Sequence, residues 1–289
     1  MIIARIAYEE LKNNDPVTLL VVEQELEALK QFTKEDKHSF VEAAIWHDDI
    51  KEVGWTSFTP MHYVETPYIT DNYSGDIYNE PMNVTWAIAQ QINALNNTIK
   101  PDFNTDAMFS FSWRFLIHLI GDIHQPLHAA SMYSDYFDGN DKHGRKFKVI
   151  YPENKSVKQL HQFWDSCIDQ FGSMFAPLND HEWDLIGEYA KQLTYNTPRS
   201  KLADRLKIKD YKIWIEESYN LAIEYAYNGI TPETKPSQEY IDRSRKLINE
   251  QVALAGYRLA DMIMTIKHIK YTPIIKELFI KQTDNGKIF

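Results

Sequence analysis

The chain has 289 residues, 44% of them hydrophobic and 25% charged, which is typical of a globular protein and excludes a disordered or fibrous chain. Its formal net charge of −10 at pH 7 argues against binding nucleic acid through overall electrostatics alone, since binders of polyanions usually present a basic face. The single cysteine, Cys167, excludes an intramolecular disulfide and a cysteine-based zinc site, and no apolar run approaches the roughly 20 residues of a membrane helix.

Hydrophobic residues recur with a helical period along most of the chain. A first helix is expected near residues 2–11, and Asp15 followed by Pro16 predicts the N-cap and first turn of a second helix. The main β signal is the alternating run over 146–151, beside Gly144. Further helices are expected over 39–54, 83–97, 106–124, 157–170, 181–194, 211–227 and 237–268.

No internal repeat and no low-complexity linker divides the chain. The loops at 66–82 and 229–237 are interpreted as surface excursions rather than domain boundaries. The polar residues of interest lie between 48 and 165, and the helices on either side are expected to provide packing. We therefore expect an all-α fold, a single multi-helix domain over 1–289 with a small β-hairpin.

Two segments share one spacing that suits a metal ion, His118-x-x-x-Asp122 and His161-x-x-x-Asp165. Both fall in helical patterns, so the imidazole and the carboxylate of each pair lie on one helix face, one turn apart. Zn²⁺ prefers such nitrogen and oxygen ligands. His128 follows a proline that is expected to kink or restart the helix and to redirect the chain.

An isolated pair of this kind is more often a surface ion pair or a capped core histidine. Two such pairs near His128, and near the polar segments around Asp48 and His62, favour a metal centre instead. Apolar residues surround His118 and Asp122, which predicts that both are at least partly buried. A buried histidine and a buried carboxylate require partners, and a metal ion satisfies both.

The run over 115–128 reads FLIHLIGDIHQPLH and resembles the central motif of the S1/P1-type (class I) nucleases. Nearly the whole chain resembles this family, with the matching segments in the expected order. The family shares its fold with zinc phospholipase C, and that fold is helical with a small β element, as the periodicity predicts. The other matching segments are Trp46–Asp48, His62–Pro67, Gly139–Asp141, Leu160–Asp165, Glu217–Ser218 and Ala255–Ala260.

The resemblance implies two zinc sites within the chain as given. The second is the more open, and its implied ligands are His128, His161 and Asp165. A third zinc is expected in the intact protein, bridged through Asp122 and completed by a histidine and an amino-terminal tryptophan that would precede Met1. The implied ligands of the first zinc are Asp48, His62, His118 and Asp122.

The activity implied is hydrolysis of phosphodiester bonds in single-stranded DNA or RNA to 5′-phosphorylated nucleotides, with 3′-nucleotidase activity alongside. Asp48 and Asp122 are the expected catalytic carboxylates, and Lys51 is an expected catalytic cation that also binds the phosphate. A solvated surface lysine is the alternative reading of Lys51.

Three more residues match positions that contact substrate in the family. Tyr63 is expected to stack on a base, although a core tyrosine is equally consistent with the sequence. Glu65 and Asn140 are expected to bind base edges through hydrogen bonds. Glu65 stands where the family usually has aspartate, and Asp138 where a glycine is common, so the base preference stays open.

Basic residues gather between Asn140 and His161 in this otherwise acidic chain. A solvated hairpin is one interpretation, and a basic track that guides the nucleic-acid backbone toward the zinc ions is the other. The residues of this basic cluster are Lys142, Arg145, Lys146, Lys148, Lys155 and Lys158.

Three alternatives stay open on the sequence. A zinc phospholipase C has the same fold, although Asp165 stands where that enzyme commonly has glutamate. The dyad His47–Asp48 would suit an HD-type phosphohydrolase, with His47 as a ligand, but the later motifs are then unexplained. A non-catalytic, zinc-stabilised binding protein is the third.

The expected partners are single-stranded nucleic acid or a 3′-nucleotide, with no membrane span and no protein partner implied. The opening residues do not show a signal-peptide pattern. Family members are exported, so the resemblance implies a secreted or periplasmic protein.

Overall fold

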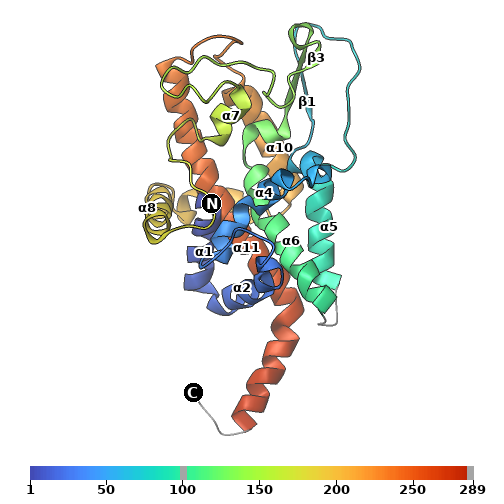
Figure 1. Ribbon diagram of the computed structural model, residues 1–289, viewed down its shortest axis with the longest axis vertical. Helices are drawn as coiled ribbons and strands as arrows, with labels where there is room; N and C mark the ends of the chain where they lie inside the picture. Colours follow the sequence, from blue (N-terminus) through green and yellow to red (C-terminus); the bar gives the residue numbers. More distant parts are fainter. Residues whose placement is uncertain (98–102, 285–289) are drawn as a thin grey trace.

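A computed structural model describes the backbone of residues 1–97 and 103–284 and the side chains of 1–96 and 105–267. It confirms the predicted all-α class with a small β element (Figure 1). The helices are α1 (Ile2–Asn14), α2 (Pro16–Lys30), α3 (Ser39–Glu42), α4 (Trp46–Glu52), α5 (Val84–Asn97), α6 (Phe103–Asp122), α7 (Leu160–Asp165), α8 (Asp180–Asn196), α9 (Ala203–Lys207), α10 (Tyr211–Leu221) and α11 (Gln238–Asp284). The strands are β1 (Pro67–Ile69), β2 (Ser131–Ser134) and β3 (Gly139–Asn140).

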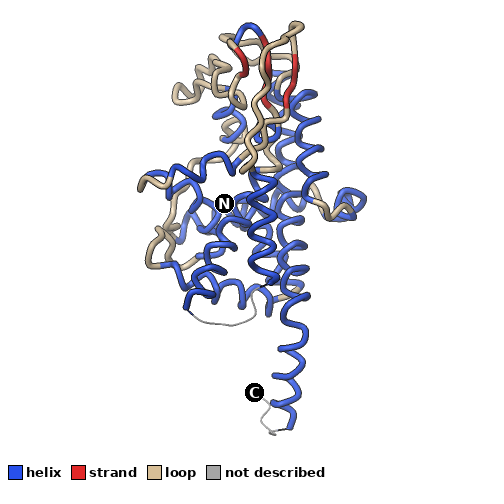
Figure 2. The backbone as a smooth tube through the Cα atoms, turned by 90° about the vertical axis from the view of Figure 1, so that its right-hand side faces the viewer, coloured by secondary structure: helices blue, strands red, loops and turns tan. Residues whose placement is uncertain are grey.

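The sheet lies at one end of the molecule, and α11 runs along the helices toward the other end and extends beyond them (Figures 1 and 2). β2 pairs with β3 in antiparallel register, Tyr133 opposite Asn140, which forms a small hairpin earlier in the chain than the sequence predicted. β1 pairs with β2 in parallel, Pro67 opposite Ser131, so it lies inside the segment predicted as the loop 66–82.

The β run predicted over 146–151 is wrong: this segment forms single bridges but no strand. Its alternating pattern has another physical cause. Phe147, Val149 and Tyr151 are buried, with 1%, 5% and 7% exposure, while the backbone bonds to separate segments. Val149 N–H donates to the Lys158 carbonyl, whereas Ile150 N–H donates to that of Thr234. The alternation therefore reflects burial of a loop and not a ladder.

Two predicted helices are shorter than their patterns suggested. The helix expected over 39–54 is divided into α3 and α4 by a 3₁₀ turn, Ala43–Ile45. The one expected over 157–170 contains only α7, because 167–169 have positive φ angles of 53°, 55° and 56°. α9 was not predicted at all, and a π-helical turn, Ala222–Ala226, continues α10.

α6 lies at the centre of the fold and is apolar around most of its circumference. It packs against α2, α5 and α11, and its residues 115–117, 119 and 120 have at most 1% exposure. Such a helix is buried on all sides. Its two polar residues of interest, His118 and Asp122, are therefore carried into the interior as the sequence predicted, with side-chain exposures of 7% and 14%.

α1 packs along α11 and against α8, so the first helix of the chain lies against the last one (Figure 1). We propose that residues 1–289 form one domain; residues 98–102 and 285–289 of that range lie outside the described part. Within the described residues, none of the helices has the combination of length and apolar character needed to cross a bilayer.

A buried ion pair holds α6 in place one turn before His118. Arg114 and Glu35 have side-chain exposures of 0% and 1%, and the guanidinium donates to both carboxylate oxygens, at 2.8 and 2.6 Å. It also donates to the Leu26 carbonyl at 3.0 Å, which ties α6 to α2. Removing one partner of such a pair leaves an uncompensated charge in the core.

Arg114→Met is therefore expected to lower the free energy of unfolding by about 3–5 kcal/mol, because Glu35 loses its only described ionic partner. Chemical denaturation measures the change. Lys37→Ala breaks the exposed pair with Asp180 and is the control, with an expected effect of about 0–1 kcal/mol. An Arg114→Met effect no larger than that of the control would contradict the assignment.

Candidate metal and active site

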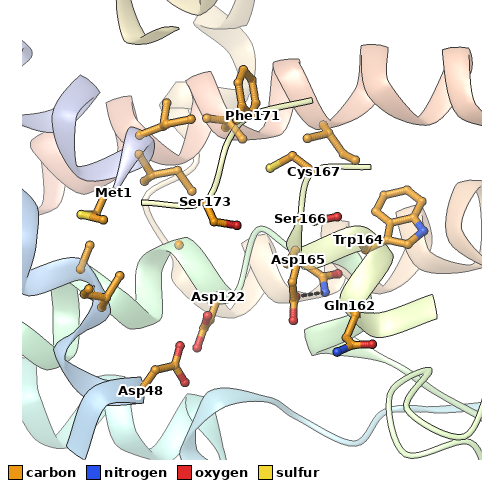
Figure 3. Close-up of a pocket in the computed structure, with 18 of the residues that line it drawn as sticks. Met1, Asp48, Asp122, Gln162, Trp164, Asp165, Ser166, Cys167, Phe171 and Ser173 are labelled. Atoms are coloured by element: carbon orange, nitrogen blue, oxygen red, sulfur yellow. Dashed lines mark hydrogen bonds between the residues drawn. The ribbon is translucent and has the colours of Figure 1, made fainter. Parts of the chain in front are cut away.

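A cavity of about 690 Å³ opens between the start of α1, the C-terminal half of α6 and α7 (Figure 3). Each of the residues predicted as metal ligands lines it, and so does Lys51. The other predicted substrate contacts, Tyr63, Glu65 and Asn140, do not line it. Side chains that are far apart in the sequence therefore meet at one wall, as the metal hypothesis requires.

The first cluster comprises Asp48 on α4, His62 at the end of the 3₁₀ helix Thr56–His62, and His118 and Asp122 on α6. The Asp122 Oδ2 atom lies 2.9 Å from His62 Nδ1 and 3.0 Å from His118 Nε2, and these two nitrogens are 2.9 Å apart. The Asp48 carboxylate lies 3.8 Å from His62 Nε2 and 3.9 Å from His118 Nε2.

The second cluster comprises His128 in the turn Pro126–Ala129 and His161 and Asp165 on α7. The Asp165 carboxylate lies 3.4 Å from His128 Nε2 and 3.2 Å from His161 Nε2. Gln125 donates from Nε2 to Asp165 Oδ1 at 2.8 Å. Proline at the start of the turn redirects the chain after α6, as the sequence predicted.

Backbone carbonyls orient three of these histidine rings. In each ring the Nδ1 atom is the donor. His118 donates to the Ala44 carbonyl at 2.6 Å, and His128 donates to the His62 carbonyl at 2.9 Å. His161 donates to the His143 carbonyl at 2.7 Å. Each bond turns the Nε2 atom of its ring toward the cavity that these residues line. This is the tautomer and the outer support that metal-binding histidines use.

Asp122 connects the two clusters and controls their electrostatics. Its second oxygen, Oδ1, lies 3.6 Å from His128 Nδ1. Burial alone would lower the pKa of His118, but the carboxylates of Asp122 and Asp48 raise it to about 9. Burial would raise the pKa of Asp122, yet His118 and His128 hold it well below its usual range. Without a metal, a proton on His118 thus supplies the positive charge that the carboxylates require.

The donor set fits a tetrahedral zinc ion. Ligands with bonds of about 2.0–2.2 Å to such an ion are separated by roughly 3.3–3.6 Å. The separations given above, from 2.9 to 3.9 Å, bracket that range, with Asp48 near Nε2 of His62 and Asp122 near its Nδ1. Mixed imidazole and carboxylate donors, with nitrogen prominent, favour zinc over magnesium.

Lys51 lies one turn after Asp48 on α4, and its Nζ atom donates to Asp48 Oδ1 at 2.7 Å. Its side chain is 28% exposed, so it is neither a fully solvated lysine nor a core residue. At the cavity wall it presents a cation beside the first cluster, as expected for a phosphate contact.

The predicted base contacts gather beside the sheet. Asn140 donates from Nδ2 to Glu65 Oε1 at 2.6 Å, and burial raises the pKa of that carboxyl group. The Tyr63 ring lies against His143, with centroids 4.1 Å apart, and carries the Arg145 guanidinium 4.9 Å from its centroid. Glu65 and Asn140 are therefore brought together, whereas Tyr63 already has neighbours on its ring.

Sequence reasoning undervalued two residues. His47 is fully buried, stacks on His62 with centroids 4.0 Å apart, and has no hydrogen-bond partner on either nitrogen among the described residues. Ligand-type atoms of His47, His62 and His118 all lie within 4.8 Å of one another. The second is Arg145, which the sequence grouped with five lysines. Of the basic cluster, Arg145 lines the cavity, and the five lysines do not.

Comparisons with known proteins agree with this geometry. The family model described as S1/P1 Nuclease matches residues 1–268. Endonuclease 5 of Arabidopsis thaliana is 27% identical over 227 residues, which cover 74% of this chain and 73% of that protein. Nuclease S1 of Aspergillus oryzae is 25% identical over 227 residues, 75% of each chain. Endonuclease 4 of Arabidopsis thaliana is 27% identical over 230 residues, covering 74% of this chain and 73% of that protein.

Adding Zn²⁺ to metal-free protein is expected to raise its melting temperature, because the ion binds the folded clusters and not the dispersed ligands of the unfolded chain. At a free concentration a hundred times the dissociation constant, the gain is about 2.7 kcal/mol. His118→Asn should abolish most of the shift, while the same substitution at the exposed His181 should preserve it. An unshifted melting curve for the parent protein would contradict the metal assignment.

The same titration repeated across pH tests the electrostatics. His118 keeps its proton below about 9 in the metal-free protein, and that proton must leave when a metal ion binds. Metal affinity is therefore expected to rise as the pH increases from 6.5 toward 9. An affinity that stays constant over this range would show that no proton leaves His118 when the ion binds, and would contradict its raised pKa.

Proposed function

The chain belongs to the S1/P1 nuclease family, and from this premise we propose that it is a zinc-dependent nuclease acting on single-stranded DNA or RNA. It cleaves phosphodiester bonds to 5′-phosphorylated nucleotides and also removes phosphate from 3′-nucleotides. The observation that carries this proposal is the position of Asp122, whose two oxygens contact the first and the second cluster. A phosphate seated between the clusters would be within reach of both.

We propose two zinc sites on the clusters as defined. The first is held by Asp48, His62, His118 and Asp122, and the second by His128, His161 and Asp165. When bound, the ions would supply positive charge to the phosphate oxygens and acidify water. The donor geometry and the carbonyl-bonded histidines support this assignment.

The chain's own residues then have distinct tasks. Asp122 and Asp48 face the cavity and orient the attacking water, whose proton finally neutralises the departing 3′-oxygen. Lys51 contributes a positive charge to the phosphate and is held in position by Asp48, 2.7 Å away. The leaving 3′-oxygen lies on the side of the second cluster, so the phosphate stays on the 5′ end of the product. Water attacks phosphorus in line with that departing oxygen.

Substrate recognition is proposed beside the sheet. Glu65 and Asn140 form one hydrogen-bonded unit, which can present both a carboxylate acceptor and an amide to a base edge. Tyr63 supplies an aromatic surface near the second cluster, 6.5 Å from His128 between ring centroids. Export of the protein remains a prediction from the family, and cell fractionation would test it.

Family membership favours the nuclease over the phospholipase C and HD-type alternatives. Assays on single-stranded DNA, a 3′-mononucleotide and phosphatidylcholine separate these activities. We expect zinc-dependent hydrolysis of the first two and none of the third. Cleavage of the lipid alone would replace the nuclease proposal with the phospholipase, and a zinc-loaded protein without turnover would support a binding protein.

Asp122→Asn is expected to lower kcat on single-stranded DNA on the order of a thousandfold or more, because the lost charge serves both clusters and the attacking water. Asp165→Asn should have a smaller effect, since Asp165 contacts the second cluster only and its side chain is 44% exposed. Asp204→Asn, at a side chain 94% exposed, is the matched control. Equal losses at Asp122 and Asp165 would contradict the bridging role.

A further inference from the structure

Arg145 stands apart from the rest of the basic cluster. It lies in the loop between β3 and α7 and lines the cavity at the second metal cluster. Lys146 instead donates to the Phe137 carbonyl at 3.0 Å, and Lys148 pairs with Glu233 at 3.0 Å on the surface. At the cavity, the basic track suggested by the sequence therefore consists of the Arg145 guanidinium alone.

The backbone before Arg145 is built to hold it against α7. Residues 142–144 all have positive φ, at 51°, 59° and 83°, a conformation that costs free energy outside glycine. At Gly144 a side chain would meet the His161 backbone nitrogen at 3.1 Å, so only glycine allows this approach. The His143 carbonyl accepts the Nδ1–H of His161 at 2.7 Å. One loop thus orients His161 and positions Arg145 beside it.

The Arg145 guanidinium is hydrogen-bonded to the His161 ring nitrogen that a metal ion would bind. Arg145 Nη2 donates to His161 Nε2 at 3.1 Å, because the other ring nitrogen already donates to a carbonyl. Since the Nδ1 proton goes to the His143 carbonyl and a guanidinium can only donate, Nε2 is the acceptor of a neutral ring. A metal ion and Arg145 therefore compete for one lone pair.

The charge of Arg145 is left without an ionic partner in the described part of the chain. Within the described side chains, no carboxylate forms an ion pair with it, and its other close contact is the Tyr63 ring. Arg258 provides a comparison inside the same protein. It donates to His124 Nε2 at the same distance, 3.1 Å, but Glu217 accepts from it at 2.9 and 3.1 Å. Arg258 is thus a neutralised structural residue, whereas Arg145 presents free positive charge to the cavity.

We propose that Arg145 is a phosphate-binding residue of the active site, which leaves His161 when a metal ion takes that lone pair and then donates to a phosphate oxygen of the substrate. The inference rests on the proposed nuclease function. The Tyr63 ring, whose centroid lies 4.9 Å from the guanidinium carbon, supports this side chain beside the cavity. An arginine suits the task, because its planar fork can bind two oxygens of one phosphate at once.

Two affinities measured on the same variants test this exchange. Metal-free Arg145→Gln is compared with the parent protein for Zn²⁺ binding against a chromophoric chelator. Zinc-loaded protein is then titrated with inorganic phosphate and with thymidine 5′-monophosphate by calorimetry. Arg145→Gln should bind zinc as tightly as the parent protein or more tightly, since a competitor for His161 is gone. Its affinity for both phosphate probes should fall about 10- to 100-fold.

Lys146→Gln is the matched control, because it removes the neighbouring positive charge outside the cavity and should leave both affinities unchanged. Arg145→Lys keeps the positive charge but lacks the planar set of N–H donors of a guanidinium. Its phosphate affinity should therefore lie between those of Arg145→Gln and the parent protein. Turnover of a 3′-mononucleotide by Arg145→Gln should show the loss chiefly in KM if the contact is made equally to bound substrate and transition state.

Three results would overturn the inference. Parallel weakening of zinc and phosphate binding in Arg145→Gln would make Arg145 a structural support of the second cluster. An unchanged phosphate affinity would remove it from the substrate site. If the parent protein binds zinc but neither phosphate probe, the proposed function itself is contradicted. This failure differs from the other two because it concerns the parent protein and not the variant.

Discussion

The fold is organised around the burial of an imidazole and a carboxylate on one apolar helix. His118 and Asp122 lie on α6, whose neighbouring side chains are almost completely buried. Such groups destabilise a core unless other polar groups or an ion compensate them. The raised pKa of His118 and the lowered pKa of Asp122 show how strongly each stabilises the charged form of the other. The site is therefore a consequence of how the core is built, and not an addition to its surface.

Several irregular features follow from this requirement. The 3₁₀ turn Ala43–Ile45 interrupts a helix, and within it the Ala44 carbonyl accepts the proton of His118. The chain leaves α6 through a proline turn that places His128 against the carbonyl of His62. The strained loop over 142–144 serves His161 in the same way. Each irregularity thus brings a histidine ring and a backbone carbonyl together, and such a carbonyl would otherwise be used within a regular helix or strand.

The acidic net charge and the proposed anionic substrate are compatible because a phosphate responds to local charge. At the cavity, carboxylates and histidines are arranged to accept metal ions, while Lys51 and Arg145 are the basic side chains at its wall. Lys51 is paired with Asp48, and Arg145 rests on a neutral ring. The charge that a phosphate would meet is thus set by bound metal and by these two side chains, and not by the molecular average of −10.

The sequence by itself determined the helical class, most helix positions and most of the histidines and carboxylates that line the cavity, because periodicity and i, i+4 spacing are local properties. It placed His118 with Asp122 and His161 with Asp165 correctly on their helices. The sequence wrongly predicted a strand over 146–151, because a buried loop there shows the same alternation of apolar and polar residues as a strand. It also could not distinguish Arg145 from the lysines beside it. Only the tertiary structure decided which carbonyl orients each histidine, which charges are neutralised and which residues line the cavity. These depend on contacts between segments distant in sequence, and no local pattern encodes such distances.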